Sequence, residues 1–208
     1  YIDPVAEFFN RYGIKTALLI LLLVGFYRVS DIVLGVISNV FYVDLGFSKN
    51  VIAGITKLYG VGMTIVGGFL GGMLTLRYGV LAILFLGALL SAATNLLFMM
   101  LASAGANVAM LTVVIAVDNL SAGLAATAFV AYLSSLTNIS FTAVQYALFS
   151  SLMTLFPKLF GGYSGTIVDT FGYNSFFLLT TLMGVPVLIL IWVLHKKLAV
   201  ARVPSAEE

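Results

Sequence analysis

Long apolar runs separated by short polar turns dominate this chain. Each run is long enough to cross a bilayer, which takes about 20 residues at 1.5 Å of rise per residue. The runs cover approximately residues 16–42, 49–76, 80–101, 108–136, 142–168 and 176–194. The pattern predicts an all-α integral membrane protein with six transmembrane helices. Residues 1–15 would form a polar, amphipathic lead-in or linker, and residues 198–208 a polar tail.

The composition supports a membrane protein and excludes several other classes. The chain is 62% hydrophobic and 9% charged, whereas soluble domains carry about 25% charged residues. A net charge of +2 is too small to indicate a nucleic-acid partner, and the absence of cysteine excludes disulfides, cysteine-based zinc sites and Fe–S clusters. The chain begins with Tyr1 and shows no signal peptide, so we interpret it as part of a longer protein. No cofactor or metal site is predicted.

Five charged side chains interrupt the apolar runs. They are Arg28 and Asp31 in the first run, Lys57 in the second, Asp118 in the fourth and Lys158 in the fifth. A carboxylate at the bilayer centre costs at least ~2.5 kcal/mol on insertion scales, so charges there are usually functional. Counting from the outer helix ends places all five roughly 12 to 21 Å deep in a core about 30 Å thick. Spans one, two, four and five should therefore line a cavity, with spans three and six facing lipid or bracing the bundle.

This predicted layer has a formal charge of +1, which suits an anionic or zwitterionic solute. Polar side chains that could bind the same solute by hydrogen bonds are Asn39, Asn119 and Gln145. A purely structural role is the alternative: Arg28 and Asp31 at i,i+3 spacing can form an ion pair, and Asp118 could pair with Lys57 or Lys158. Because buried ion pairs contribute little to stability, placement at mid-membrane favours a functional role.

The distribution of basic residues in the short loops predicts the orientation. With six spans, both termini lie on one side of the membrane, and the basic residues on that side are Arg11, Lys15, Arg77, Lys196, Lys197 and Arg202. The opposite side has only Lys49. The positive-inside rule therefore predicts that both termini of these six spans are cytoplasmic.

Glycine patterns indicate an internal repeat and close helix packing. The segments Gly72–Gly79 and Gly165–Gly172 both read G-x-aliphatic-x-x-x-x-G and start 93 residues apart, the length of one three-helix unit. They fall at opposite membrane faces, as an inverted 3+3 repeat requires. Arg77 occupies the first segment and Asp169 the second. The Gly67/Gly71 and Gly68/Gly72 pairs are small-xxx-small patterns, typical of closely packed helices.

The six-span plan and the Gly72–Gly79 motif resemble the C-terminal half of a major facilitator transporter. The resemblance implies a gating role for Gly72, Arg77 and Gly79, and for their repeat counterparts Gly165, Asp169 and Gly172. In this family an acidic residue usually precedes the arginine of the motif, and this chain has Leu76 there.

Within that family, three stretches resemble the AmpG-type muropeptide permeases: residues 27–31, 118–131 and 140–151. The resemblance implies proton-driven import of anhydromuropeptides, for cell-wall recycling, across the bacterial inner membrane from periplasm to cytoplasm. It covers about half of such a protein, so an N-terminal six-helix half is the expected partner. Arg28, Lys57 and Lys158 would attract substrate carboxylates, Asp118 or Asp31 would carry the proton, and rocking of the bundle would alternate access.

Several function classes are alternatives to the transport of muropeptides. They are transport of another anionic or zwitterionic solute, a binding or signalling membrane protein, and a channel, in which charges of both signs would trap ions. An intramembrane protease is suggested by Gly162-Tyr-Ser164-Gly165, which matches the GxSG of rhomboids. However, Ser164 and the single histidine, His195, are predicted roughly 30 Å apart, where catalysis needs about 3 Å. We therefore expect no enzyme, with Ser164 as a packing residue and His195 at the interface.

Overall fold

A computed structural model describes the backbone of residues 2–200 and the side chains of residues 3–197. Its elements, in chain order, are α1 (Ile2–Tyr12), α2 (Ile14–Phe26), α3 (Val29–Asp44), α4 (Lys49–Ile52), the π-helix η1 (Ala53–Tyr59), α5 (Gly60–Tyr78), α6 (Val80–Ala104), α7 (Val108–Leu136), the 3-10 helix η2 (Ile139–Phe141), α8 (Thr142–Gly161) and α9 (Ser164–Val200). Residues 201–208 of the predicted tail, Arg202 among them, lie outside the described residues.

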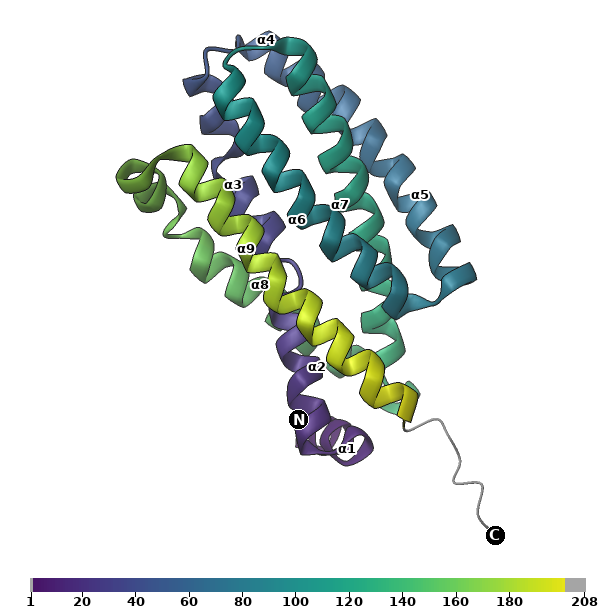
Figure 1. Cartoon of the computed structure of the whole chain (residues 1–208). Coiled ribbons are helices and arrows are strands. Elements are labelled where there is room, and N and C mark those ends of the chain that lie inside the picture. Colours follow the sequence, from purple (N-terminus) through teal and green to yellow (C-terminus); the bar gives the residue numbers. More distant parts are fainter. Residues whose placement is uncertain (1, 201–208) are drawn as a thin grey trace.

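The predicted all-helical fold with six membrane spans is confirmed. Six segments of the described chain are long and apolar enough to cross a bilayer: Ile14–Asp44, Lys49–Tyr78, Val80–Ala104, Val108–Leu136, Ile139–Gly161 and Ser164–Lys197. Figure 1 shows α6 between α7 and α9, with α5 packed along the far side of α7. Helices α2 and α3 pack against α8 and α9. Helix α1 and the end of α9 lie at the same end of the bundle, which we call the terminal end (Figure 1).

The first span is broken in the middle rather than continuous. Helix α2 ends at Phe26, and α3 starts at Val29 after Arg28, whose φ of −100° and ψ of 7° are not helical. Tertiary contacts hold the break in place. The ring of Tyr27 stacks on Phe129 with centroids 4.5 Å apart, and its hydroxyl donates a hydrogen bond to the Leu84 carbonyl. Tyr27 is thereby buried in the apolar core, whereas Arg28 next to it is only half-buried.

The second span contains a different irregularity close to its own charged residue. A π-helix, η1, occupies Ala53–Tyr59 between α4 and α5, and Lys57 lies inside it. Short π-helical insertions are frequently found at functional sites. Two of the four charge-bearing spans therefore depart from α-helical geometry next to their cation.

The fifth span ends earlier than the sequence pattern indicated. We predicted a helix to Val168, but α8 ends at Gly161, and a turn at Gly162 and Tyr163 follows. Residues 164–171 form a short helical segment that is separated from the rest of α9 by Gly172, with φ 76° and ψ 170°. Apolar residues continue through this segment, so hydropathy alone did not reveal the turn. Seven residues of predicted span therefore lie outside α8.

Glycine allows α5 and α7 to approach to backbone contact, as the small-xxx-small pairs predicted. A Cβ atom added at Gly67 would overlap the Leu120 carbonyl oxygen, and one added at Gly71 would lie 2.8 Å from the Leu124 Cα. On the facing helix, a Cβ at Gly123 would overlap the Thr64 carbonyl oxygen. The glycines of both helices are thus packing residues, and they fix the distance between the two spans that carry Lys57 and Asp118.

Candidate functional site

A layer of polar side chains separates two apolar clusters along the bundle axis. One cluster, toward the terminal end, includes Ala88 of α6 and Leu124 of α7; the other includes Phe98 and Ile115 of the same helices. Between these clusters lie buried or half-buried polar residues from four spans: Arg28, Ser30, Asp31, Ser91, Thr94, Asn95, Asp118 and Thr180. Since this layer is midway along the helices, its charges are far from both membrane surfaces.

The layer opens into a cavity of about 330 Å³, which we call the central cavity. Six of the eight residues predicted to bind substrate or protons line it: Arg28, Asp31, Asn39, Lys57, Asp118 and Asn119. The remaining lining residues are Leu34, Gly35, Ser38, Tyr42, Thr56, Phe98, Ile115 and Ala122. The structure therefore brings most of the predicted set to one site, with contributions from α3, η1, α6 and α7.

Asp31 is held by a cation and a hydroxyl group. Its Oδ2 lies 3.7 Å from Arg28 Nη2, and its Oδ1 accepts a 2.6 Å hydrogen bond from Ser91 Oγ of α6. Asp31 also lies in the first turn of α3, where the helix dipole favours a negative charge. The Nε–H of Arg28 is buried without a hydrogen-bond partner among the described groups. The Arg28 side chain as a whole is 27% exposed and lines the cavity, so a ligand can contact the exposed part of its guanidinium.

Asp118 has fewer partners than Asp31. Its Oδ1 accepts one hydrogen bond of 3.2 Å from Thr94 Oγ1 of α6. The described part of the chain places no Lys or Arg nitrogen within 4.0 Å of it, so the predicted pairs with Lys57 and Lys158 are not formed. Arg28 and Asp31 make the only ion pair of the layer within this region, and the alternative in which every charge is neutralised structurally is not supported.

Asn119 is largely occupied by its own neighbours. Its Oδ1 accepts a 3.0 Å hydrogen bond from Thr64 Oγ1 of α5, and its Nδ2 donates to the Ile115 carbonyl at 2.9 Å. The first bond links α5 to α7 beside the glycine contact. Asn39 and Lys57, by contrast, are exposed on the open side of the cavity. These two side chains have the most freedom to contact a solute.

Two predicted members of the site lie elsewhere, and the early end of α8 accounts for the first of them, Lys158. Lys158 is exposed in the last turn of that helix rather than at mid-membrane. Gln145 is buried near its start, at the terminal end. Span five therefore contributes nothing to the central cavity. Without Lys158, the charge of the cavity is zero when both aspartates are ionised, rather than +1.

Gln145 instead joins the lead-in helix α1 to the bundle. Its Nε2 donates hydrogen bonds to Glu7 Oε2 at 2.7 Å and to the Pro4 carbonyl at 2.9 Å, and its Oε1 accepts from the Asn138 amide. The Asn138 side chain also donates to Glu7, and Arg11 pairs with Glu7 at 3.4 Å. The hydrogen bond from Asn138 and, second, the one from Gln145 lower the pKa of Glu7. Burial raises this pKa, and the charge of Arg11 lowers it by a smaller amount.

Span three provides functional side chains that the sequence analysis did not identify. We expected α6 to face lipid or brace the outside because it has no charge, yet Ser91 and Thr94 each bind one of the aspartates. Asn95 donates to Ser30 Oγ at 2.7 Å, and Ser30 donates to the Thr180 carbonyl of α9. The i, i+3, i+4 spacing of the three polar residues on an apolar helix was the available signal.

The two repeat motifs end in glycines of the same conformation. Gly79 has φ 86° and ψ 157°, and Gly172 has φ 76° and ψ 170°. Each makes a sharp turn between helices, a backbone geometry that only glycine adopts readily. A Cβ atom added at Gly72 would lie 3.7 Å from the Thr127 side chain, which is ordinary contact. Gly165 and Asp169 are exposed on the short segment after α8. Arg77 lies beside the Tyr78 ring.

The protease alternative is not supported by the position of its serine. Ser164 is fully buried at the start of α9, where its Oγ lies 3.5 Å from the Val33 carbonyl of α3. His195 lies on the same element 31 residues later, exposed at the terminal end. Ser164 thus packs two helices together, as predicted.

Comparisons with known proteins point to one family. Residues 11–208 match the Major Facilitator Superfamily. Relatives include "Putative transporter AmpG 4" of Rickettsia conorii, 36% identical over 96% of this chain, and "Putative transporter AmpG 1" of Rickettsia bellii, 35% identical over 89%. An uncharacterized protein of Haemophilus influenzae is 35% identical over 91%. The chain spans about half the length of these relatives, 45–47%.

Proposed function

Because the chain belongs to the Major Facilitator Superfamily, we propose that it forms the C-terminal half of a proton-coupled importer of anhydromuropeptides. Two findings support this proposal: the similarity to proteins named AmpG and the arrangement of charges in the central cavity. The single observation that carries it is that two acids and two cations share this cavity with one ion pair, 3.7 Å long, among them. The family is not enzymatic, which agrees with a site built for binding.

The cations of the cavity are suited to an anionic or zwitterionic solute. Arg28 has a buried, unused Nε–H, and Lys57 extends from the π-helix without an acidic partner within 4.0 Å in the described region. Guanidinium and ammonium groups with free donors bind carboxylates strongly. Asn39, exposed on the open side of the cavity, adds hydrogen-bonding groups for the amides or hydroxyls of a peptide or sugar.

We assign the proton to Asp118 rather than Asp31. Asp31 already has Arg28 and Ser91 as partners, whereas Asp118 has only the 3.2 Å bond from Thr94. With both acids ionised the cavity is formally neutral, and protonation of Asp118 leaves a charge of +1. An anion is then bound more tightly, and by thermodynamic reciprocity the bound anion favours the proton. Such mutual stabilisation is what a symporter needs to move both together.

The second half of the transporter is part of the proposal. The chain spans about half of its relatives, and Asn39 and Lys57 are exposed on the open side of the cavity. An N-terminal six-helix half would cover that side, and rocking of the halves would open the site to each membrane face in turn. The basic residues at the terminal end favour a cytoplasmic location for both ends of this half, in the inner membrane of a bacterium.

The test is uptake of a labelled anhydromuropeptide by cells that carry the complete transporter, with and without a protonophore. Asp118→Asn imitates the protonated acid, so binding of the solute should be retained while accumulation falls about tenfold or more, within the range of coupling energies. Asp3→Asn, an exposed acid on α1, is the matched control and should behave like the wild type.

Each outcome identifies a different error. Undiminished, protonophore-sensitive accumulation by Asp118→Asn would move the proton to Asp31. If the wild type takes up no muropeptide but the purified protein binds another anionic or zwitterionic solute, the substrate is wrong and the cavity assignment stands. If no solute is accumulated, a binding or signalling role replaces transport.

A further inference from the structure

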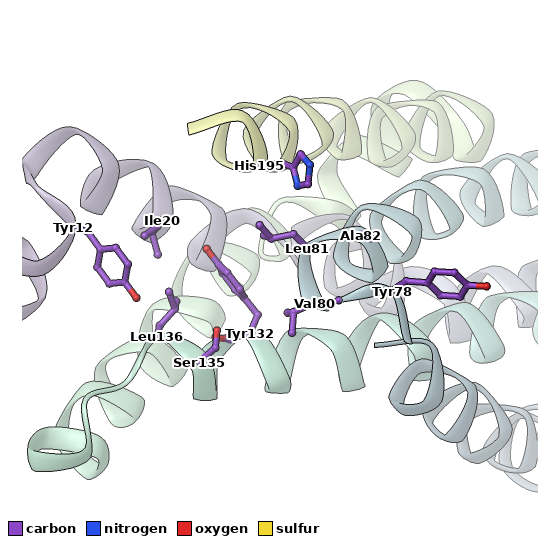
Figure 2. A pocket seen from close by; sticks show the side chains of 11 residues that line it. Tyr12, Ile20, Tyr78, Val80, Leu81, Ala82, Tyr132, Ser135, Leu136 and His195 are labelled. Carbon is purple, nitrogen blue, oxygen red and sulfur yellow. The ribbon is translucent and has the colours of Figure 1, made fainter. Parts of the chain in front are cut away.

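A second, larger cavity lies at the terminal end of the bundle and shares no residue with the central cavity. Its volume is about 700 Å³, within the range of ligand pockets. We call it the terminal cavity, and Figure 2 shows the side chains around it. Its lining residues are Tyr12, Ile20, Tyr78, Gly79, Val80, Leu81, Ala82, Tyr132, Ser135, Leu136 and His195. The transport proposal uses none of them except the motif glycine Gly79.

The lining residues place this cavity at the membrane interface. Each lies within about two turns of a helix end: at the end of α1, the start of α2, the α5–α6 turn, the last turns of α7 and the last turns of α9. The interfacial region is where tyrosine is enriched, since its ring is apolar and its hydroxyl polar. The cavity therefore lies at the depth of lipid headgroups and the upper parts of acyl chains.

One polar group of the cavity has no partner among the described residues. The side chain of Tyr132 is 3% exposed, and its hydroxyl makes no hydrogen bond with any described group. Figure 2 shows the ring of Tyr132 extending toward the space between Ile20 and Leu81. Buried tyrosine hydroxyls usually have a hydrogen-bond partner. The neighbouring Ser135 hydroxyl donates to the Tyr132 carbonyl at 2.7 Å and makes no hydrogen bond with the Tyr132 hydroxyl.

Cations lie beside the cavity, each next in sequence to a lining residue. Arg77 precedes Tyr78 and lies over its ring at 5.4 Å, and Lys196 follows His195. Within residues 3–197, neither has a carboxylate within 4.0 Å. Arg11, beside Tyr12, is by contrast paired with Glu7. Within these residues, Arg77 is thus a cation without an acidic partner beside the lining residue Tyr78, and Lys196 is a second such cation at the same end of the bundle.

The outer face of α9 indicates that the cavity is next to lipid. Exposed apolar residues follow one another at i+3 and i+4 spacing along this helix: Leu178, Leu182, Val185, Ile189 and Trp192. The row ends at Lys196, whose Nζ lies 3.8 Å from the centre of the Trp192 ring. An apolar row that ends in an aromatic residue and a lysine is typical of a helix leaving the bilayer. Helix α6, the other wall, exposes Phe85 and Leu89.

We propose that the terminal cavity binds one anionic phospholipid from the adjacent leaflet. Its phosphate group would accept a hydrogen bond from the Tyr132 hydroxyl and lie near His195, Arg77 and Lys196. The upper part of an acyl chain would contact the apolar wall formed by Ile20, Leu81 and Leu136. Basic pockets between transmembrane helices are known to select anionic headgroups. This proposal does not depend on which solute the central cavity binds.

The experiment measures lipid binding to the complete transporter, purified in dodecyl maltoside, by native mass spectrometry with increasing phosphatidylglycerol. We expect one phosphatidylglycerol to bind more tightly than phosphatidylcholine. Tyr132→Phe removes only the hydroxyl, and Arg77→Gln removes the charged guanidinium, so each should weaken that binding about tenfold. Tyr163→Phe, an exposed tyrosine outside the cavity, and Lys49→Gln, a cation at the opposite end, are matched controls and should bind as the wild type does.

Three results would overturn the proposal. Equal binding by Tyr132→Phe and Tyr163→Phe would show that the lipid is bound nonspecifically around the protein. Equal affinity for phosphatidylglycerol and phosphatidylcholine would remove the role of the cations. Full displacement of the lipid by millimolar inorganic phosphate would identify a soluble phosphate ligand instead. Thermal midpoints without added lipid, which should match the wild type, verify that each variant is folded.

Discussion

Replacement of Gly67 by alanine should separate the two helices that carry the central cavity. An added Cβ would overlap the Leu120 carbonyl oxygen and lie 2.9 Å from the Leu120 Cα, where ordinary contact begins at 3.4 Å. The clash is with backbone atoms, which cannot rotate away as a side chain can. Helices α5 and α7 would have to move apart, and the 3.0 Å Thr64–Asn119 hydrogen bond across their interface would lengthen.

The magnitude follows from two opposing effects. Alanine in place of glycine inside a helix gains about 1 kcal/mol from helix propensity, while overpacking a tight contact costs about 1–3 kcal/mol. At Gly62, on the same helix, an added Cβ has no atom within 4 Å, so only the gain applies. Gly62→Ala should therefore be the more stable variant by about 1–3 kcal/mol.

The assay compares the two variants of the complete transporter in one detergent, by the midpoint of thermal unfolding and by uptake. A difference of 1 kcal/mol corresponds to roughly 2–4 °C for a chain of this size. Gly67→Ala should unfold at the lower temperature and also lose uptake, because Lys57 and Asp118 are no longer held at their distance. Equal midpoints for the two variants would refute the backbone contact between α5 and α7.

Three further predictions concern polar contacts. The pKa of Glu7 lies below its ordinary value of 4.5, so the ionised carboxylate stabilises the docking of α1. This stabilisation is complete above about pH 4.5 and is lost as the pH falls through the lowered pKa. Hydrogen exchange of α1 should therefore accelerate on acidification relative to Glu7→Gln, and identical pH profiles would contradict this. Asn95→Leu leaves Ser30 without its donor and should lower the free energy of unfolding by about 1–3 kcal/mol; an unchanged denaturant midpoint would count against the network. Ser91→Ala removes the 2.6 Å hydrogen bond to Asp31 and should lower the free energy of unfolding by about 1–3 kcal/mol, whereas Ser103→Ala, on an exposed turn of α6, should change the denaturant midpoint much less; equal midpoints for the two variants would contradict this.

Local properties of the sequence were sufficient to predict the spans and most of the polar layer. The length of an apolar run and the cost of a charge in lipid depend on each segment alone, so Arg28, Asp31, Lys57 and Asp118 could be placed at mid-membrane before any contact was known. The close packing of α5 against another helix could also be predicted from its glycine pairs, because the absence of a side chain lets a second helix approach closely.

Errors arose where depth was counted from a helix end that the sequence does not mark. Lys158 was counted from Asp169, but the chain turns at Gly162, so Lys158 lies one turn from the end of α8. Gln145 was assigned to the site from its polar side chain alone, and it lies near the start of α8, away from the cavity. Apolar residues continue past the turn, and hydropathy cannot distinguish a long helix from a short helix followed by an apolar segment.

The tertiary structure alone decided which groups meet. The break at Arg28 contains no proline and persists because Tyr27 is held between Phe129 and the Leu84 carbonyl. Ser91 and Thr94 contact the two aspartates because α6 packs beside α3 and α7. Their spacing marks a polar face of α6, but it does not reveal which residues that face meets. The sequence of each helix determines which polar and charged side chains it carries at mid-membrane. Packing determines which aspartate receives a cation and which receives only a hydroxyl, and on that difference the proposed proton site depends.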